Sequence, residues 1–120
     1  MGRDHRKLRV FSQADALVVA VYAETATFPQ DERFGLRTQV RRAAVSVPAN
    51  IVEGCARRKE GEYLQFVNIA TGSAAETLYL LELSNRLEFL KGDAYRRLEP
   101  GYTMLIKGLK KLQSSLDGER

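Results

Sequence analysis

Residue types that commonly carry chemistry are scarce in this chain of 120 residues, which has one cysteine, one histidine, three prolines and no tryptophan. The single Cys55 excludes a disulfide within the chain and is typical of a reducing compartment, so we expect a cytoplasmic protein. Cys55 and His5 are too few to form a metal site. Scarce proline and short β-branched runs favour helices over strands.

Membrane and catalytic signals are also missing from the sequence. No apolar run reaches the roughly 18 residues that a transmembrane helix needs, and the charged start MGRDHRKLRV lacks the apolar core of a signal peptide. Gly35, Gly54 and Gly61 are isolated, so they form no phosphate-binding loop, and Ser46 has no histidine to activate it. We therefore expect no membrane span, no cofactor and no enzymatic activity.

Apolar residues instead recur at helical spacing through almost the whole chain. This spacing predicts helices over 12–27, 36–57, 60–90 and about 95–116, with Ser12 as the first N-cap, a stop at Gly92 and a kink or short break at Pro100–Gly101. Residues 1–10 form a basic arm and 117–120 a loose tail. Short connections between long helices predict one domain over 1–120, an all-α antiparallel up-down four-helix bundle.

The predicted second helix organises the chain because it is apolar on two sides. One stripe faces the core of the monomer: Leu36, Val40, Ala44, Val47 and Ile51. A second stripe lies about 150° around the helix: Val45, Ala49, Val52 and Ala56. Pro48 removes one backbone bond inside the helix and predicts a kink. Two apolar faces predict a contact with another subunit, and hence a homo-oligomer.

A polar ribbon shares the far side of the same helix: Gln39, Arg42, Ser46, Asn50, Glu53 and Arg57. The third helix has two parallel stripes, one led by Phe66 and Ile69 and the other by Tyr63 and Val67. Ser73 and Glu76 interrupt the first stripe. The polar residues could form a strip that contacts a ligand or RNA, or a buried network that fixes helix register and subunit pairing. We favour the network, with Glu76 buried and paired to a residue such as Arg42.

Basic residues outnumber acidic ones, with a net charge of +4. Arg33, Arg37 and Arg41 are spaced by four and share one side of the second helix, and Arg57 and Arg58 lie near its other end. The arm and the last helix add more bases, including Lys107, Lys110 and Lys111. These charges are compatible with contacts to nucleic-acid phosphates. The alternative is a solvated surface balanced by the acids of the third helix.

One long motif resembles a known family. The string FP-x-x-E-x-F-G-L-x-x-Q-x-R-R-A-A-x-S-x-P-x-N-I-x-E-G-x-x-R, over 28–57, is similar to the bacterial four-helix-bundle family named for open reading frames in 23S rRNA intervening sequences. Ala70-x-Gly72-Ser73-x-x-Glu76 also matches, whereas Val47 and Val52 stand where Ile and Ala are more usual. The resemblance implies a four-helix bundle that assembles as a homopentamer. It extends to accessory variability proteins of diversity-generating retroelements, which partner a reverse transcriptase and nucleic acid.

Two functional hypotheses follow. The first is an oligomer whose repeated basic surfaces bind RNA or DNA through the phosphate backbone. The second is a scaffold that docks a partner protein on the oligomer and makes no contact with nucleic acid.

Overall fold

The computed structural model describes residues 3–32 and 34–117 as four long helices and two short 3₁₀ turns. The helices are α1 (Arg9–Thr25), α2 (Leu36–Cys55), α3 (Glu60–Arg86) and α4 (Gly92–Asp117), and the turns are η1 (His5–Lys7) and η2 (Gln30–Glu32). Within the described residues there is no strand. The predicted all-α fold of four packed helices is confirmed.

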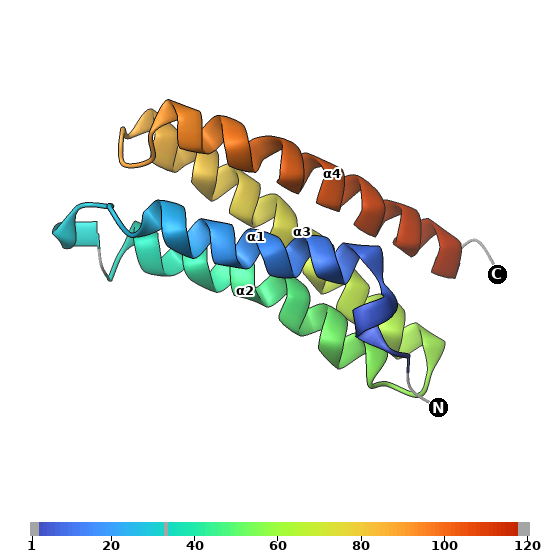
Figure 1. Ribbon diagram of the computed structural model, residues 1–120. Coiled ribbons are helices and arrows are strands. Elements are labelled where there is room, and N and C mark those ends of the chain that lie inside the picture. Colours follow the sequence, from blue (N-terminus) through green and yellow to red (C-terminus); the bar gives the residue numbers. More distant parts are fainter. Residues whose placement is uncertain (1–2, 33, 118–120) are drawn as a thin grey trace.

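The helices lie side by side in a bundle 46 × 22 × 20 Å across (Figure 1). α1 packs against α2 and α4, and α3 packs against the same two helices, whereas the described parts of the diagonal pairs do not contact one another. This square arrangement places the α1–α4 face and the α2–α3 face on opposite sides of the molecule. The two faces can therefore serve different partners.

The core is formed by one stripe from each helix. The stripe predicted for α2, from Leu36 to Ile51, is buried along its whole length. In α3 the core stripe is the one led by Tyr63 and Val67, and the stripe led by Phe66 is only partly buried, with Ile69 50% exposed. Both stripes have the same 3–4 spacing, so periodicity alone does not decide which of them faces the core.

The N-terminal region differs from the prediction. α1 begins at Arg9, and Ser12 is inside the helix, where its N–H donates to the Leu8 carbonyl at 3.3 Å, so Ser12 is not the cap. The helix extends toward the N-terminus because Val10 is buried against α4. Asp4 caps η1 instead, by accepting a hydrogen bond from the Arg6 N–H at 3.0 Å.

The described part of the basic arm packs against the end of α2 and α3. The Arg3 N–H donates to the Cys55 carbonyl at 3.0 Å, and the Arg3 guanidinium lies 4.0 Å from the centroid of the Tyr63 ring. From Arg3 onward the arm is therefore not loose. Met1, Gly2 and residues 118–120 of the predicted tail lie outside the described residues.

α4 runs without a break through Pro100–Gly101, so the short break predicted there is absent. Pro100 is exposed, and the Arg96 carbonyl that loses its helical partner can be solvated. Gly101 faces α1, where an added Cβ would lie 2.9 Å from Leu17 Cδ2. Pro48 likewise lies inside α2 and is buried.

The turn after α3 is closed by Glu88, not by the predicted glycine. Glu88 has a φ of 66°, its N–H donates to the Asn85 carbonyl, and the Phe89 N–H donates to the Ser84 carbonyl. These two bonds are those of a Schellman motif, in which the left-handed position favours glycine. Gly92 has no positive φ and begins α4.

Glu88→Gly should therefore stabilise the protein. A left-handed conformation costs a residue with a Cβ roughly 1–2 kcal/mol, and glycine avoids this cost while losing some chain entropy on folding. We expect the free energy of unfolding to rise by about 0.5–1 kcal/mol in urea titrations at a fixed protomer concentration. Glu82→Gly, inside α3, should lower it by about 1 kcal/mol. A loss of stability in Glu88→Gly would contradict the strain assigned to this turn.

Candidate functional site

The predicted arginines of the described chain lie at the two ends of α2: Arg37 and Arg41 are within its first turns, and Arg57 and Arg58 follow its last residue, Cys55. Arg41 and Arg57 are separated by about 24 Å along the axis at 1.5 Å per residue. Arg37 is half-buried, Arg57 and Arg58 are exposed, and Arg33 lies outside the described residues. No ion pair links the described members to an acid of α3, so direct pairing does not neutralise these charges.

Arg41 is engaged with the C-terminal end of α1. Its Nε donates to Thr25 Oγ1 at 2.9 Å, its Nη2 donates to the Tyr22 carbonyl at 3.0 Å, and its guanidinium lies 4.4 Å from the centroid of the Tyr22 ring. A cation is favourable beside the last carbonyls of a helix. This side chain therefore joins α1 to α2 and is less available to a ligand than its spacing with Arg37 suggested.

Arg57 has a different neighbour. Its guanidinium lies 4.8 Å from the centroid of the Phe66 ring, while the side chain remains exposed. Arg58 and Lys59 follow at the turn into α3 and are also exposed. This end of α2 therefore offers free positive charge.

Two residues of the polar ribbon meet Ser73 of α3 across the α2–α3 contact. The Ser46 and Ser73 hydroxyl oxygens lie 2.8 Å apart, and the Asn50 amide donates to the Ser46 carbonyl at 2.8 Å and to its hydroxyl at 3.0 Å. All three side chains are half-buried. The structure brings them together as a small network on the outer side of the helix pair.

The remaining members of the predicted network do not join it. Gln39, Arg42, Glu53 and Glu76 are exposed, and their side chains make no hydrogen bond or ion pair with another described residue. The prediction that Glu76 is buried and paired with α2 is wrong for the single chain. Its stripe does not face the core, so the carboxylate remains in water and needs no partner.

The apolar stripe predicted on the second face of α2 is exposed. Val45 is 40% and Val52 37% exposed, and Ala49 lies exposed between them. On the neighbouring helix α3, Ile69 and Tyr79 are 50% and 52% exposed. A row of exposed apolar residues over two adjacent helices is typical of a surface that another protein covers.

Two ionisable side chains, Cys55 and Tyr63, are buried next to each other. Burial raises the pKa of the Cys55 thiol, and burial raises the pKa of the neighbouring Tyr63 phenol to about 12. Both groups are therefore neutral near pH 7. Among the described residues, no group of His, Cys, Asp and Glu could hold a metal ion.

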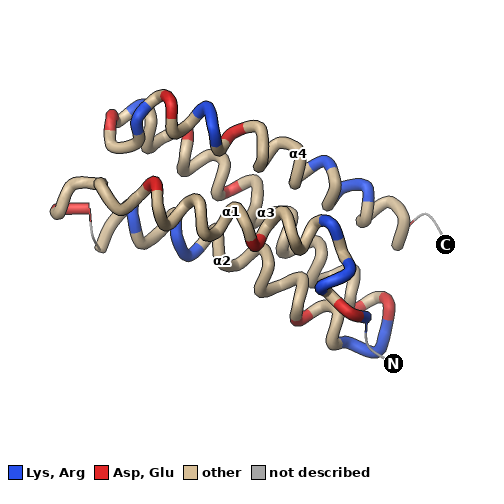
Figure 2. Tube along the Cα trace, in the orientation of Figure 1, with Lys and Arg blue, Asp and Glu red and all other residues tan. Residues whose placement is uncertain are grey.

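Basic residues gather in the half of the bundle that contains the N-terminal arm, the α2–α3 turn and the last turns of α4 (Figure 2). The residues are Arg3, Arg6, Lys7, Arg9, Arg57, Arg58, Lys59, Lys107, Lys110 and Lys111. Arg6 is paired with Asp4 at 3.2 Å, and no ion pair between described residues involves the others. This half of the molecule therefore has a net positive charge, although exposed acids such as Glu53, Glu60 and Glu62 also lie in it.

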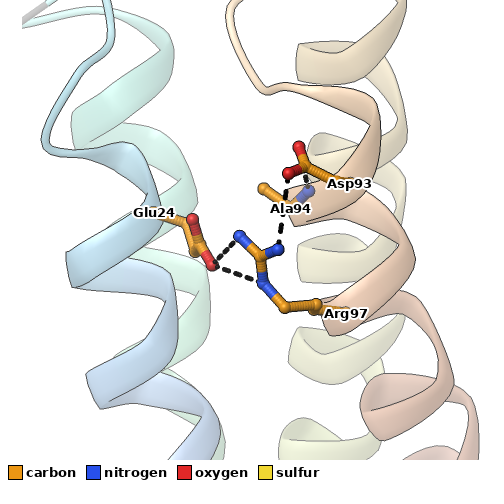
Figure 3. A network of polar contacts seen from close by, with 4 residues as sticks. All are labelled: Glu24, Asp93, Ala94 and Arg97. Carbon is orange, nitrogen blue, oxygen red and sulfur yellow. Dashed lines mark hydrogen bonds and ion pairs between the residues drawn. The ribbon is translucent and has the colours of Figure 1, made fainter.

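In the opposite half, one base is neutralised by two acids. Arg97 donates from Nε and Nη2 to Glu24 Oε2 at 3.1 and 2.8 Å, and its Nη1 lies 3.5 Å from Asp93 Oδ2 (Figure 3). The Ala94 N–H donates to Asp93 and lowers the pKa of this carboxyl. The network joins α1 to α4 and leaves little free positive charge on Arg97.

Comparisons with known proteins show the family and a solved structure with the same fold. The profile of the family described as 23S rRNA-intervening sequence protein matches residues 6–111. The chain belongs to this family. The match spans the motif in α2, the polar network and the basic residues of α4 up to Lys111.

A solved structure also resembles the bundle over most of its length. It is a protein of unknown function from the S23 ribosomal protein family of Bacteroides thetaiotaomicron, with a TM-score of 0.80 and 25% sequence identity. The alignment covers 87% of this chain and 97% of the other. No protein with a curated description matches. In the described part of the chain, no helix is both long and apolar enough to cross a membrane.

The sequence identified most of the charged residues, but it could not assign them to shared surfaces. Arg9 and Lys107 are almost a hundred positions apart, and only the packing of α1 on α4 brings them to one surface. Lys107 and Lys111 have the spacing of four that places two side chains on one side of a helix, which was the one available signal.

Proposed function

We propose that this family member acts by binding, as an oligomer whose repeated basic surfaces hold the phosphate backbone of RNA or DNA. The observation that carries the proposal is the electropositive half of the bundle, where most bases have no acidic partner among the described residues. Phosphate contacts release condensed counterions, which supports binding with little dependence on base sequence. Repetition around an assembly would increase a weak affinity by multivalency.

The exposed apolar residues of α2 and α3 support the assembly in this proposal. They lie on α2 and α3, with Val45 beside Tyr22 of α1, so covering them can leave the surface of α4 accessible. The family resemblance supplies the number of subunits, a homopentamer. We retain the prediction of a bend in α2 at Pro48, which would shape the surface offered to a neighbouring subunit. The proposal places the protein in the cytoplasm, where Cys55 would stay reduced.

Electrophoretic mobility of the protein with a structured RNA and with duplex DNA, at about 50 and 200 mM salt, tests the proposal. We expect a shift of either nucleic acid at the lower salt and a large loss of affinity at the higher, because each phosphate contact adds about 0.9 to the slope of log K against log salt. A protein that shifts neither nucleic acid at 50 mM salt would disprove the proposal.

The exposed apolar row also favours a second candidate, a scaffold that docks a partner protein. In that case Val45, Val52 and Ile69 would contact the partner, and the basic charge would serve solubility. This candidate, a partner docked on the oligomer, is preferred if the mobility experiment is negative.

A further inference from the structure

A shallow groove between α1 and α4 brings together three exposed basic side chains. Its volume is about 370 Å³, and α1 contributes Arg9, Val10 and Gln13 while α4 contributes Met104, Lys107, Gly108 and Lys111. Arg9, Lys107 and Lys111 are all exposed, and none of these three side chains makes a hydrogen bond or an ion pair with another described residue. Two walls of the groove therefore each present free positive charge.

The floor of the groove is narrow because two helices touch there. Gly108 has no side chain, and an added Cβ would lie 2.9 Å from Val10 Cγ1. The close contact brings Arg9 on α1 within one groove of the lysines on α4. Lys107 and Lys111 are one helical turn apart, about 6 Å along the axis, so the charges follow a line and do not converge on one point.

We propose that this groove is the principal contact of the protein with the phosphodiester backbone of a nucleic acid. The inference deepens the proposed function and depends on it. A linear anion with about one charge per 3.4 Å of each strand can contact both lysines, with Arg9 on the other wall. A compact anion would need converging donors, and the backbone N–H groups inside two long helices are already bonded within them.

The surroundings of the groove favour a polyanion over an acidic protein. Met104 is the one large apolar side chain of the groove that is strongly exposed, at 62%. Protein interfaces generally derive their affinity from a cluster of buried apolar or aromatic anchors, which this surface lacks. None of the exposed apolar residues of α2 and α3 lines the groove, so an oligomer formed through them can leave it open.

Three double variants that each remove two positive charges test the location. Lys107→Gln with Lys111→Gln alters the groove, Arg57→Gln with Arg58→Gln alters the α2–α3 end, and Lys91→Gln with Arg96→Gln removes exposed charge from the far end as the matched control. Affinity for the RNA and DNA of the mobility experiment is measured for each from 50 to 200 mM salt. Circular dichroism and light scattering verify that fold and assembly are unchanged.

For the groove variant we expect the salt slope to fall by about 2 for each protomer that contacts the nucleic acid, since each lost phosphate contact contributes roughly 0.9. The advantage of the wild type over this variant should then shrink on the order of tenfold between 50 and 200 mM salt. Adding Arg9→Gln should reduce the slope further, and the far-end variant should bind nearly as the wild type does.

Several outcomes would overturn the inference. If the wild type binds and the groove variant behaves like the far-end control, or if the Arg57 and Arg58 variant loses more, the main contact lies elsewhere while the proposed function stands. If the wild type binds no nucleic acid, the proposed function fails as well. Two further arms identify other sources of phosphate. Binding only to phosphatidylserine vesicles, or displacement of RNA by inorganic phosphate but not by chloride at equal ionic strength, would assign the groove to a lipid or to free phosphate.

Discussion

Gly54→Ala should lower the free energy of unfolding by about 2 kcal/mol, although alanine is the better helix former. A Cβ at this position would lie 2.9 Å from Phe66 Cβ and 3.1 Å from Tyr63 Cδ1. The Phe66 Cβ cannot rotate away, and the Tyr63 carbonyl lies only 3.4 Å from the added atom. The two helices must therefore separate, and overpacking of this kind costs typically 1–3 kcal/mol.

Thermal and urea unfolding of Gly54→Ala measure this effect at one protomer concentration, because assembly adds to apparent stability. The matched control is Gly72→Ala in the middle of α3, where an added Cβ meets nothing within 4 Å. Helix propensity alone should make that variant more stable by up to about 1 kcal/mol. If both variants gain stability, α2 and α3 can adjust at Gly54 and the close contact is not a constraint.

Val45→Asp combined with Val52→Asp should convert the proposed oligomer into a monomer of 13.5 kDa. Both valines are exposed in the single chain, so the folded monomer should tolerate the two substitutions. In the proposed assembly they are covered, and burying two unpaired carboxylates costs several kcal/mol, more than an interface of modest size can supply. Light scattering across a dilution series measures the change in mass.

Met104→Asp provides the control for this experiment. Met104 is more exposed than either valine, at 62%, but it lies on α4, away from the row on α2 and α3. It should leave the mass unchanged, and circular dichroism should show equal helix content in both proteins. An unchanged mass in the double variant would place the subunit contact on another surface, and a monomeric wild type at micromolar concentration would refute the assembly itself.

The sequence predicted the helices well because their apolar spacing is nearly continuous, and it predicted the core stripe of α2 residue by residue. The prediction from sequence failed where two alternative packing faces of a helix have the same local pattern. The Phe66 and Tyr63 stripes of α3 have equal spacing, and the choice between them depends on packing against α2 and α4. Treating the Phe66 stripe as buried led directly to the wrong prediction that Glu76 is buried.

Helix ends were the other weakness, for a related reason. Ser12 is a good capping residue, but burial of Val10 against α4 extends the helix past it. Glu88 takes the left-handed position although Gly92 lies four residues further on. The α1–α4 groove was beyond sequence reasoning, because its charges come from opposite ends of the chain. For Arg41, the spacing of four with Arg37 predicted a charge available to a ligand, whereas the structure shows its side chain in contact with the end of α1.

The reactivity of Cys55 can report local opening of the bundle. The Cys55 thiol is buried at the end of α2, and the Cys55 backbone carbonyl accepts a hydrogen bond from the Arg3 N–H of the docked arm. A thiol-specific reagent can reach it only when this end of the bundle opens. The rate of modification, compared with that of an exposed thiol, therefore measures the free energy of this opening. Because Arg57 and Arg58 follow in the next turn, the same rate would report whether a bound polyanion holds this end of the bundle closed.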